Sequence, residues 1–362
     1  MVTSAARDAM FMDRALFLAE RGRGRTSPNP IVGAVVVTAD GVVVGQGAHL
    51  EAGGPHAEVH ALEAAGDRAR GATLYCTLEP CCHAGRTGPC TTRIVSAGIA
   101  RVVAAIRDPN PLVAGRGVEY LRAHGVQVAE GEGARDSAML NRPFFTWVTK
   151  HRPFVTIKTA MSADGFVGRP DRRVRLTGPQ TNRWFQRQRA EVDAIAVGAG
   201  TVLIDDPWLT ARTVYRYRPL TRVIFDRRAR VTPSARVFST LADGPVIIIV
   251  SRSLPTDRQA NVDALELLGA AIVRADGDDL AAMLGMLADR GILWLLVEGG
   301  PTLQNAFDRA GLVDRVQRAT TPHVLGDGVP AAAIARGTPA APQDVRQLGA
   351  DTLTEFDVHR TD

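Results

Sequence analysis

Three residues of metal-ligand type and one carboxylate are spaced as a water-activating metal centre requires. His56 and Glu58 lie two residues apart at the start of a helical stretch, and Cys81 and Cys90 follow in a loop rich in Gly, Pro and Cys. Three ligands of mixed nitrogen and sulfur type, with a fourth position open to water, are typical of catalytic zinc. A nearby carboxylate that is not a ligand can move the protons. The pattern predicts a zinc-dependent deaminase of a nucleobase-like ring, with Glu58 as its acid–base group.

Neighbouring residues offer alternatives for the ligand positions. Cys82 is the rival of Cys81, which is favoured because it directly follows proline, as in the deaminase signature. His60 lies four residues after His56, but the order His-x-Glu-x-His differs from the His-Glu-x-x-His of metalloproteases. Cys76 lies inside an apolar run and is expected in the core.

Composition indicates a two-domain globular protein. The chain has 362 residues, 45% of them hydrophobic and 22% charged, which is ordinary for soluble domains. No apolar run reaches the length of a membrane span, and residues 1–21 lack the features of a signal peptide, so a cytoplasmic location is expected. The net charge of +5 comes from scattered arginines without a basic run. We therefore expect no nucleic-acid and no membrane partner.

Short apolar runs alternate with helical patterns along the first half. Helices are expected at 10–21, 57–70, 91–97, 115–124 and 134–142, and strands at 31–38, 42–45, 72–77, 101–106 and 126–128. This alternation predicts an α/β layered domain over 1–146, with the boundary near 145–152.

The second half repeats the alternation with different lengths. Strands are expected at 155–159, 194–197, 222–225, 246–250, 271–273, 293–297 and 352–358, and helices at 179–190, 260–268, 279–290 and 301–310. A second α/β domain is therefore predicted over 152–362, with 330–342 as a surface loop.

The motifs of the first half resemble one known family. Residues 26–30 (Thr-Ser-Pro-Asn-Pro), 47–49 (Gly-Ala-His), 55–62 (Pro-His-Ala-Glu-Val-His-Ala-Leu) and 78–90 occur in the order found in the deaminase half of the bifunctional riboflavin-biosynthesis deaminase–reductases. The resemblance implies a cytidine-deaminase-like α/β/α domain. It also implies a small-molecule substrate, a diaminopyrimidinone that bears a ribosylamino 5-phosphate. By this resemblance the substrate contacts would be Asn29, His49, His83 and Arg86.

The second half resembles the reductase domain of the same family, which is similar to dihydrofolate reductase in fold. The matching motifs are residues 158–165, 198–212 and 297–303. A glycine pair that opens a helix, as in the last motif, can bind a pyrophosphate. The resemblance implies NADPH as cofactor, Lys158 and Asp205 as catalytic groups, and substrate contacts from Arg173, Arg189, Leu209, Arg212 and Glu298. The implied cofactor contacts are Met161, Arg175, Thr201, Asp205, Gly300, Pro301, Thr302 and Leu303.

Two departures from the family pattern leave alternatives open. Arg175 stands where an aromatic residue is expected near the cofactor, and Arg227 stands where serine is common. They favour, as one alternative, a degenerate reductase half that serves only as an oligomerisation scaffold. A second alternative is a deaminase of tRNA or DNA with an unrelated partner domain, which the long spacing from Cys81 to Cys90 disfavours. The main prediction is a bifunctional enzyme that forms a homo-oligomer.

Overall fold

The chain forms two compact units, Met1–His151 and Arg152–Asp362. The structure is a computed structural model, and it describes residues 4–83, 88–172, 174–276, 279–337 and 342–358. Strands and helices alternate in both units, which confirms the predicted α/β class. Among the described helices, none combines the length and the apolar character that crossing a membrane demands.

The first unit contains six helices and five strands within the described residues. They are α1 (Ser4–Ala19), β1 (Gly33–Val37), β2 (Val43–Ala48), α2 (Ala57–Ala65), β3 (Thr73–Cys76), α3 (Cys90–Ser96), β4 (Arg101–Ala104), α4 (Arg116–Ala123), β5 (Gln127–Glu130), α5 (Ala134–Leu140) and α6 (Arg142–Lys150). The sheet order is β2-β1-β3-β4-β5. β1 is antiparallel to both of its neighbours, and β3, β4 and β5 are parallel.

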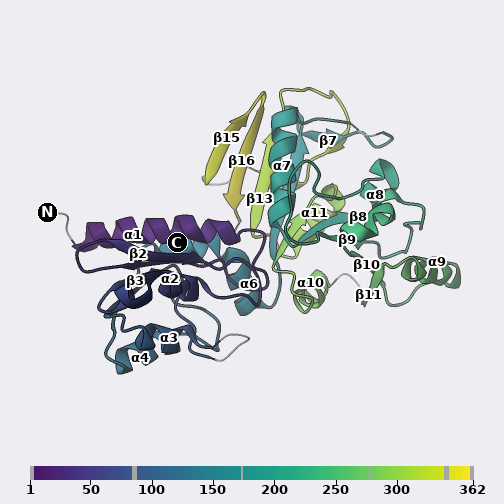
Figure 1. Cartoon of the computed structure of the whole chain (residues 1–362). Helices are drawn as coiled ribbons and strands as arrows, with labels where there is room; N and C mark the ends of the chain where they lie inside the picture. Colours follow the sequence, from purple (N-terminus) through teal and green to yellow (C-terminus); the bar gives the residue numbers. More distant parts are fainter. Residues whose placement is uncertain (1–3, 84–87, 173, 277–278, 338–341, 359–362) are drawn as a thin grey trace. The chain divides into compact units, whose positions relative to one another are not determined.

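Helices cover both faces of this sheet, so the unit has the predicted three layers. Phe11 and Met12 of α1 pack on one face, against alternate residues of β1, β3 and β4. Ala61 of α2, Ile94 of α3 and Leu121 of α4 pack on the other. Figure 1 shows α1 on one side of the strands and α2, α3 and α4 on the opposite side.

Two glycines of β2 let α2 approach the sheet closely. A Cβ atom at Gly45 would lie 2.0 Å from the carbonyl oxygen of Ala61, and one at Gly47 would lie 2.4 Å from that of Ala57. Any larger residue would have to push the helix away. This contact fixes the start of α2, and therefore His56 and Glu58, against the sheet.

The second unit is built on a larger sheet. Its elements are β6 (Phe154–Met161), β7 (Phe166–Gly168), α7 (Pro179–Glu191), β8 (Ala194–Gly198), α8 (Ala199–Asp205), β9 (Thr221–Phe225), β10 (Val246–Ser251), α9 (Thr256–Leu267), β11 (Ala271–Ala275), α10 (Leu280–Ala288), β12 (Trp294–Val297), α11 (Pro301–Arg309), β13 (Arg315–Thr320), β14 (Val329–Pro330), α12 (Ala333–Arg336), β15 (Asp344–Leu348) and β16 (Asp351–Asp357). Three 3-10 helices, one of them in this unit, occupy Glu20–Gly22, Gly66–Ala69 and Arg236–Asp243.

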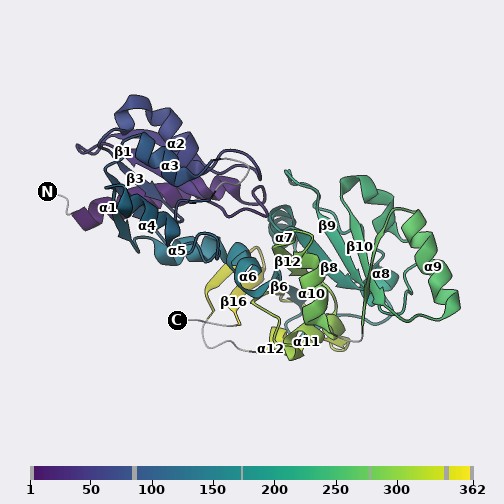
Figure 2. The ribbon, with the colours of Figure 1, turned by 90° about the horizontal axis from the view of Figure 1, so that it is seen from below.

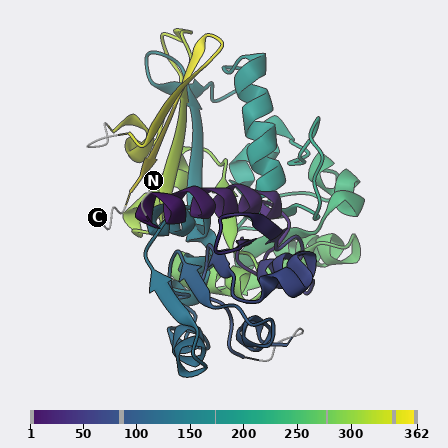
Figure 3. The ribbon, with the colours of Figure 1, turned by 60° about the vertical axis from the view of Figure 1, so that its left-hand side comes forward.

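Nine strands form the main sheet, in the order β11-β10-β9-β8-β12-β6-β13-β16-β15. Figure 2 shows β10, β9, β8, β12 and β6 side by side. The strands from β11 to β13 are parallel, whereas β16 and β15 form an antiparallel hairpin at one edge, yellow in Figures 1 and 3. Leu265 of α9 packs on one face of the sheet, and Leu284 of α10 and Phe307 of α11 on the other.

Several elements differ from the sequence expectations. The domain end expected at residue 146 falls inside α6, because this amphipathic helix continues to Lys150. β13 was not predicted, since four of its six residues are polar, yet it lies inside the sheet between β6 and β16. The short helix α12 lies in the region 330–342, where a loop was expected.

Candidate active sites

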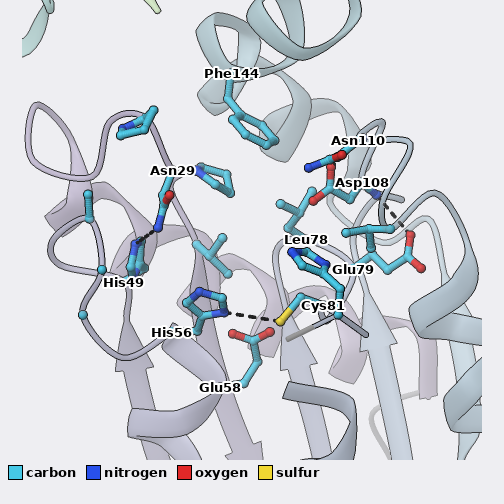
Figure 4. Close-up of a pocket in the computed structure, with 18 of the residues that line it drawn as sticks. Asn29, His49, His56, Glu58, Leu78, Glu79, Cys81, Asp108, Asn110 and Phe144 are labelled. Carbon is cyan, nitrogen blue, oxygen red and sulfur yellow. Dashed lines mark hydrogen bonds between the residues drawn. The ribbon is translucent and has the colours of Figure 1, made fainter. Parts of the chain in front are cut away.

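The first unit holds a cavity of about 390 Å³ at one edge of its sheet. Its lining includes six residues that the sequence singled out: Asn29, His49, His56, Glu58, Cys81 and His83. Figure 4 shows the first five of them facing the same space. Arg86 lies outside the described residues.

The expected metal ligands converge beneath this cavity. The ligand atoms of His56, Cys81 and Cys90 all lie within 4.8 Å of one another. His56 Nδ1 is 3.3 Å from Cys90 Sγ and 3.5 Å from Cys81 Sγ. His56 directly precedes α2 and Cys90 is the first residue of α3, so two helix N-termini meet at the cluster. Cys82 turns its Sγ toward the carbonyl oxygen of Leu112, 3.9 Å away, and is not part of the cluster.

The charges of this cluster fit a divalent cation. A hydrogen bond with Cys90 lowers the pKa of Cys81 to about 4, and the same contact raises the pKa of Cys90. Burial raises the pKa of Glu58, and the Cys81 charge adds to this effect. The two thiols therefore share a proton when only protein groups are present. A cation between them would favour both thiolates, which are the forms that bind zinc.

His49 and Asn29 form a polar pair on the cavity wall. Asn29 Nδ2 lies 3.0 Å from His49 Nε2, and His49 Nδ1 lies 3.0 Å from the carbonyl oxygen of Pro55. Burial lowers the pKa of His49, which favours the neutral ring. An Nδ1–H that donates to Pro55 and an Nε2 that accepts from Asn29 satisfy both contacts. This leaves the Asn29 carboxamide oxygen available to the cavity.

Among the lining residues outside the sequence motifs, which the sequence analysis did not single out, four are polar or aromatic. Asp108 and Asn110 follow β4, and Phe144 and Trp147 belong to α6. The first pair had a usable signal, because ligands of parallel sheets bind beyond the carboxyl ends of the strands. Burial raises the pKa of Asp108 to about 6. The second pair had none, because α6 spans the expected boundary between the domains.

The second unit holds a larger cavity, of about 770 Å³. Nearly all the residues expected in the reductase half line it: Lys158, Arg175, Arg189, Thr201, Asp205, Leu209, Arg212, Glu298, Gly300, Pro301, Thr302 and Leu303. Met161 instead packs against the alanines at 331, 332 and 335 and is not in the described lining. Arg173 lies outside the described residues.

A buried carboxylate with two cations lies in this cavity. Arg189 Nε and Nη2 each donate to Glu298 at 2.8 Å, and Lys158 Nζ lies 3.8 Å from the same carboxylate. Burial opposes ionisation of Glu298, but the two cations outweigh it and lower its pKa to about 2. Burial lowers the pKa of Lys158 despite the attraction of Glu298. Arg189 also donates to the carbonyl oxygen of Thr210, so most of its donors serve protein groups rather than the open cavity.

Two further contacts shape the cavity. Asp206, directly after α8, accepts from the backbone and the guanidinium of Arg236 at 2.8 and 2.9 Å, which fixes the segment that leads to Leu209 and Arg212. On the opposite wall, Gln304 donates to the carbonyl oxygen of Gly299 at 2.8 Å and accepts from Thr159 Oγ1 at 2.8 Å. The Gly299–Gly300 turn is thereby tied to β6.

Comparison with known proteins assigns both units. The family model of the RibD C-terminal domain matches residues 153–353, and that of the cytidine and deoxycytidylate deaminase zinc-binding region matches residues 5–106. Riboflavin biosynthesis protein RibD of Aquifex aeolicus is 40% identical over 331 residues, 89% of each chain. The Escherichia coli protein of that name is 40% identical and covers 88% of this chain and 89% of its own.

Solved structures agree over nearly the whole chain. Acinetobacter baumannii RibD, form 2, superposes with a TM-score of 0.86 at 35% identity and covers 98% of this chain and 99% of its own. A Thermotoga maritima protein described as a diaminohydroxyphosphoribosylaminopyrimidine deaminase/5-amino-6-(5-phosphoribosylamino)uracil reductase superposes at 0.84, with 34% identity and the same coverage.

The fold and the two sites define a pyrimidine deaminase joined to a reductase. The chain belongs to the RibD family, the bifunctional deaminase–reductases of riboflavin biosynthesis. This confirms the predicted family and the predicted pair of activities, and it decides against a deaminase of tRNA or DNA.

Glu298 should make the stability of the second unit depend on pH. Because its pKa is lowered from 4.5 to about 2, its contribution is fully present above pH 4.5 and is lost as the pH falls toward 2. Glu298→Gln should lower the free energy of unfolding at neutral pH, since it leaves two cations without their anion. It should also flatten the fall of stability with acid. Denaturant unfolding at several pH values measures both effects.

Glu266→Gln, at an exposed position of α9, is the matched control. Its free energy of unfolding should fall with acid as steeply as that of the unmodified chain. If the free energy of unfolding of Glu298→Gln fell with acid as steeply as that of the unmodified chain, the lowered pKa of Glu298 would be contradicted.

Proposed function

We propose that this chain deaminates 2,5-diamino-6-(5-phosphoribosylamino)pyrimidin-4-one in the first cavity and reduces the ribosyl group of the product to ribityl in the second, with NADPH. The observation that carries the proposal is the pair of cavities, each of which gathers the motif residues of one half of the family. Both volumes lie within the usual range for small-molecule sites. A homo-oligomer and a cytoplasmic location remain predictions.

In the first cavity we assign His56, Cys81 and Cys90 to zinc and Glu58 to proton transfer. When bound, zinc lowers the pKa of a water molecule toward neutrality. Glu58 has a buried carboxylate with a raised pKa, which suits a group that must both accept and release a proton near neutral pH. It takes a proton from the attacking water and delivers it to the departing ammonia, so that a C–O bond replaces a C–N bond.

The substrate ring and sugar phosphate are assigned to the polar walls of the cavity. Asn29 and His49 face it from one side, and Asp108 and Asn110 from the other, after β4. Phe144 supplies an aromatic surface between them. His83 lines the cavity too, and its Nδ1 is buried without a hydrogen-bond partner in the described structure, as a donor or acceptor reserved for a ligand would be.

In the second cavity we assign Lys158 and Glu298 to the opened sugar and Asp205 to the space between substrate and cofactor. NADPH supplies the hydride, and the protein contributes mainly position. Arg212 is assigned to the phosphate. Arg189 holds the Glu298 carboxylate through two hydrogen bonds, so its support of the substrate passes through Glu298. Arg175 and Thr201 line the cavity where the cofactor is expected.

About one zinc ion per chain should copurify with the protein. His56→Ala and Cys90→Ser should each remove most of it, because each takes away one of the three ligands that converge among the described residues. Cys82→Ser and Cys76→Ser are matched controls that alter a thiol outside the cluster, and both should keep the metal. Elemental analysis measures the zinc content of each variant. A low zinc content in the unmodified chain that neither His56→Ala nor Cys90→Ser changes would contradict the assignment.

Glu58→Gln should keep the zinc but lower the deamination rate by at least about 100-fold, the usual scale for a general acid–base group. The amide has nearly the same shape but cannot carry the proton. Ammonia release measures the loss, while NADPH oxidation on supplied deaminated intermediate should be unchanged. Glu63→Gln, on the exposed side of the same helix, should be fully active. Loss of zinc in Glu58→Gln would make Glu58 a ligand and overturn its role.

Asp205→Ala should abolish NADPH oxidation while ammonia release continues, because Asp205 lines the second cavity and is not in the described lining of the first. The absorbance of reduced nicotinamide, with enzymatically deaminated substrate, is the readout. Asp263→Ala, on α9, is the control. An unmodified chain that deaminates but does not oxidise NADPH would instead support the scaffold alternative, with Arg175 and Arg227 as marks of a lost reductase.

A further inference from the structure

Glu79 is a buried carboxylate that the proposed chemistry does not use. It is only 3% exposed, and its two oxygens accept hydrogen bonds from four backbone amides. Oε2 accepts from Asp108 at 3.2 Å and from Gly115 at 3.0 Å, and Oε1 accepts from Gly117 at 2.9 Å and from Val118 at 3.2 Å. Hydrogen bonds to an ionised acceptor are among the strong ones in proteins.

The backbone connects Glu79 to the metal cluster. Glu79 lies two residues before Cys81 and three after the end of β3. Its own amide donates to the carbonyl oxygen of Ile106 at 2.9 Å, and the Cys81 carbonyl accepts from Thr91 of α3 at 3.2 Å. The segment that carries Cys81 is therefore held between the loop after β4 and the first turn of α3.

Hydrogen bonds connect the Glu79 carboxylate to the cavity wall. The Asp108 side chain accepts from the Asn110 amide at 2.8 Å, and the Asn110 side chain accepts from the Leu112 amide at 3.0 Å. A series of hydrogen bonds that begins at Glu79 thus fixes the wall segment 108–112. Figure 4 shows this geometry, with the Glu79 carboxylate turned away from the cavity and bonded to the backbone of Asp108.

The start of α4 packs directly against the Glu79–Pro80 segment. A Cβ atom at Gly117 would lie 2.1 Å from the carbonyl oxygen of Pro80 and 3.1 Å from Glu79 Oε1. Glycine at this position therefore lets α4 lie in close contact with the Glu79–Pro80 segment. The carboxylate also lies at the N-terminus of this helix, where a negative charge is favoured.

We propose that Glu79 is a positioning residue for deamination, which holds the Cys81 ligand and the Asp108–Asn110 wall in one fixed arrangement. The inference rests on the proposed function of the first cavity. Glu79 is among the residues that line the first cavity, but its carboxylate is bonded to backbone amides, and in this account it contacts neither metal nor substrate. It acts by setting the distance between the metal cluster and the wall that receives the substrate.

The test compares Glu79→Gln with Glu119→Gln, which makes the same chemical change at an exposed position of α4. Glutamine places an NH₂ group where two backbone N–H groups need an acceptor, so two of the four bonds are lost. Zinc should stay near one per chain, and NADPH oxidation on the supplied intermediate should not change. The KM for deamination should rise about tenfold or more, with a smaller fall in kcat. Glu119→Gln should leave both constants unchanged.

Glu79→Asp keeps the charge but shortens the side chain by one methylene, so the carboxylate can no longer reach all four backbone amides, and this variant should raise the KM in the same way. This variant decides the question if Glu79→Gln does not accumulate as folded protein. Unchanged KM and kcat per bound zinc in both variants, with only the stability lowered, would reduce Glu79 to a structural role and overturn the proposal. An unmodified chain that binds zinc but releases no ammonia would overturn the proposed function itself, and this role with it.

Discussion

The concentration of negative charge around His56 is the constraint on which the first unit depends. Cys81, Cys90 and the buried Glu58 converge on one imidazole, and burial prevents water from screening them. In the absence of a metal the proton of the thiol pair stays on Cys90, whose pKa is raised by the contact with Cys81, and burial raises the pKa of Glu58 as well. A divalent cation between the thiols would favour both thiolates, and the proposed function then leaves Glu58 as the group that exchanges a proton. The helix starts of α2 and α3 supply backbone N–H groups at the same point, which also favour anions.

The charges in the second unit are arranged in the opposite way. There the buried anion is Glu298, and two cations, Arg189 and Lys158, surround it. Glu298 follows β12 at the carboxyl end of a parallel strand, where ligands of such sheets bind. The neighbouring helix α11 begins at Pro301, with Gly300 as its N-cap. Proline has no N–H, so an anion at this turn must be met by the amides on either side. The two sites thus differ in charge, and the described residues that line each of them come from one unit.

The sequence alone indicated most of the elements of both units and the residues that stand in contiguous motifs. His56, Glu58, Cys81 and Cys90 could be found because local spacing and residue type together are specific to one chemistry. The pairing of Arg189 with Glu298, 109 residues away, could not, because no local pattern encodes it. The same holds for Glu79, whose partners come from the loop after β4 and the start of α4. Phe144 and Trp147 were missed because α6 lies across the expected domain boundary. β13 was missed because four of its six residues are polar, although the strand lies inside the sheet.

The central claim is that one chain carries out two reactions in sequence, at two separate sites. The most direct measurement is mass analysis of the product after incubation of the unmodified protein with 2,5-diamino-6-(5-phosphoribosylamino)pyrimidin-4-one, with and without NADPH. The account predicts exchange of one ring nitrogen substituent for oxygen without NADPH, and the further gain of two hydrogen atoms on the sugar with it. Unchanged substrate in both incubations, or reduction without prior deamination, would contradict it.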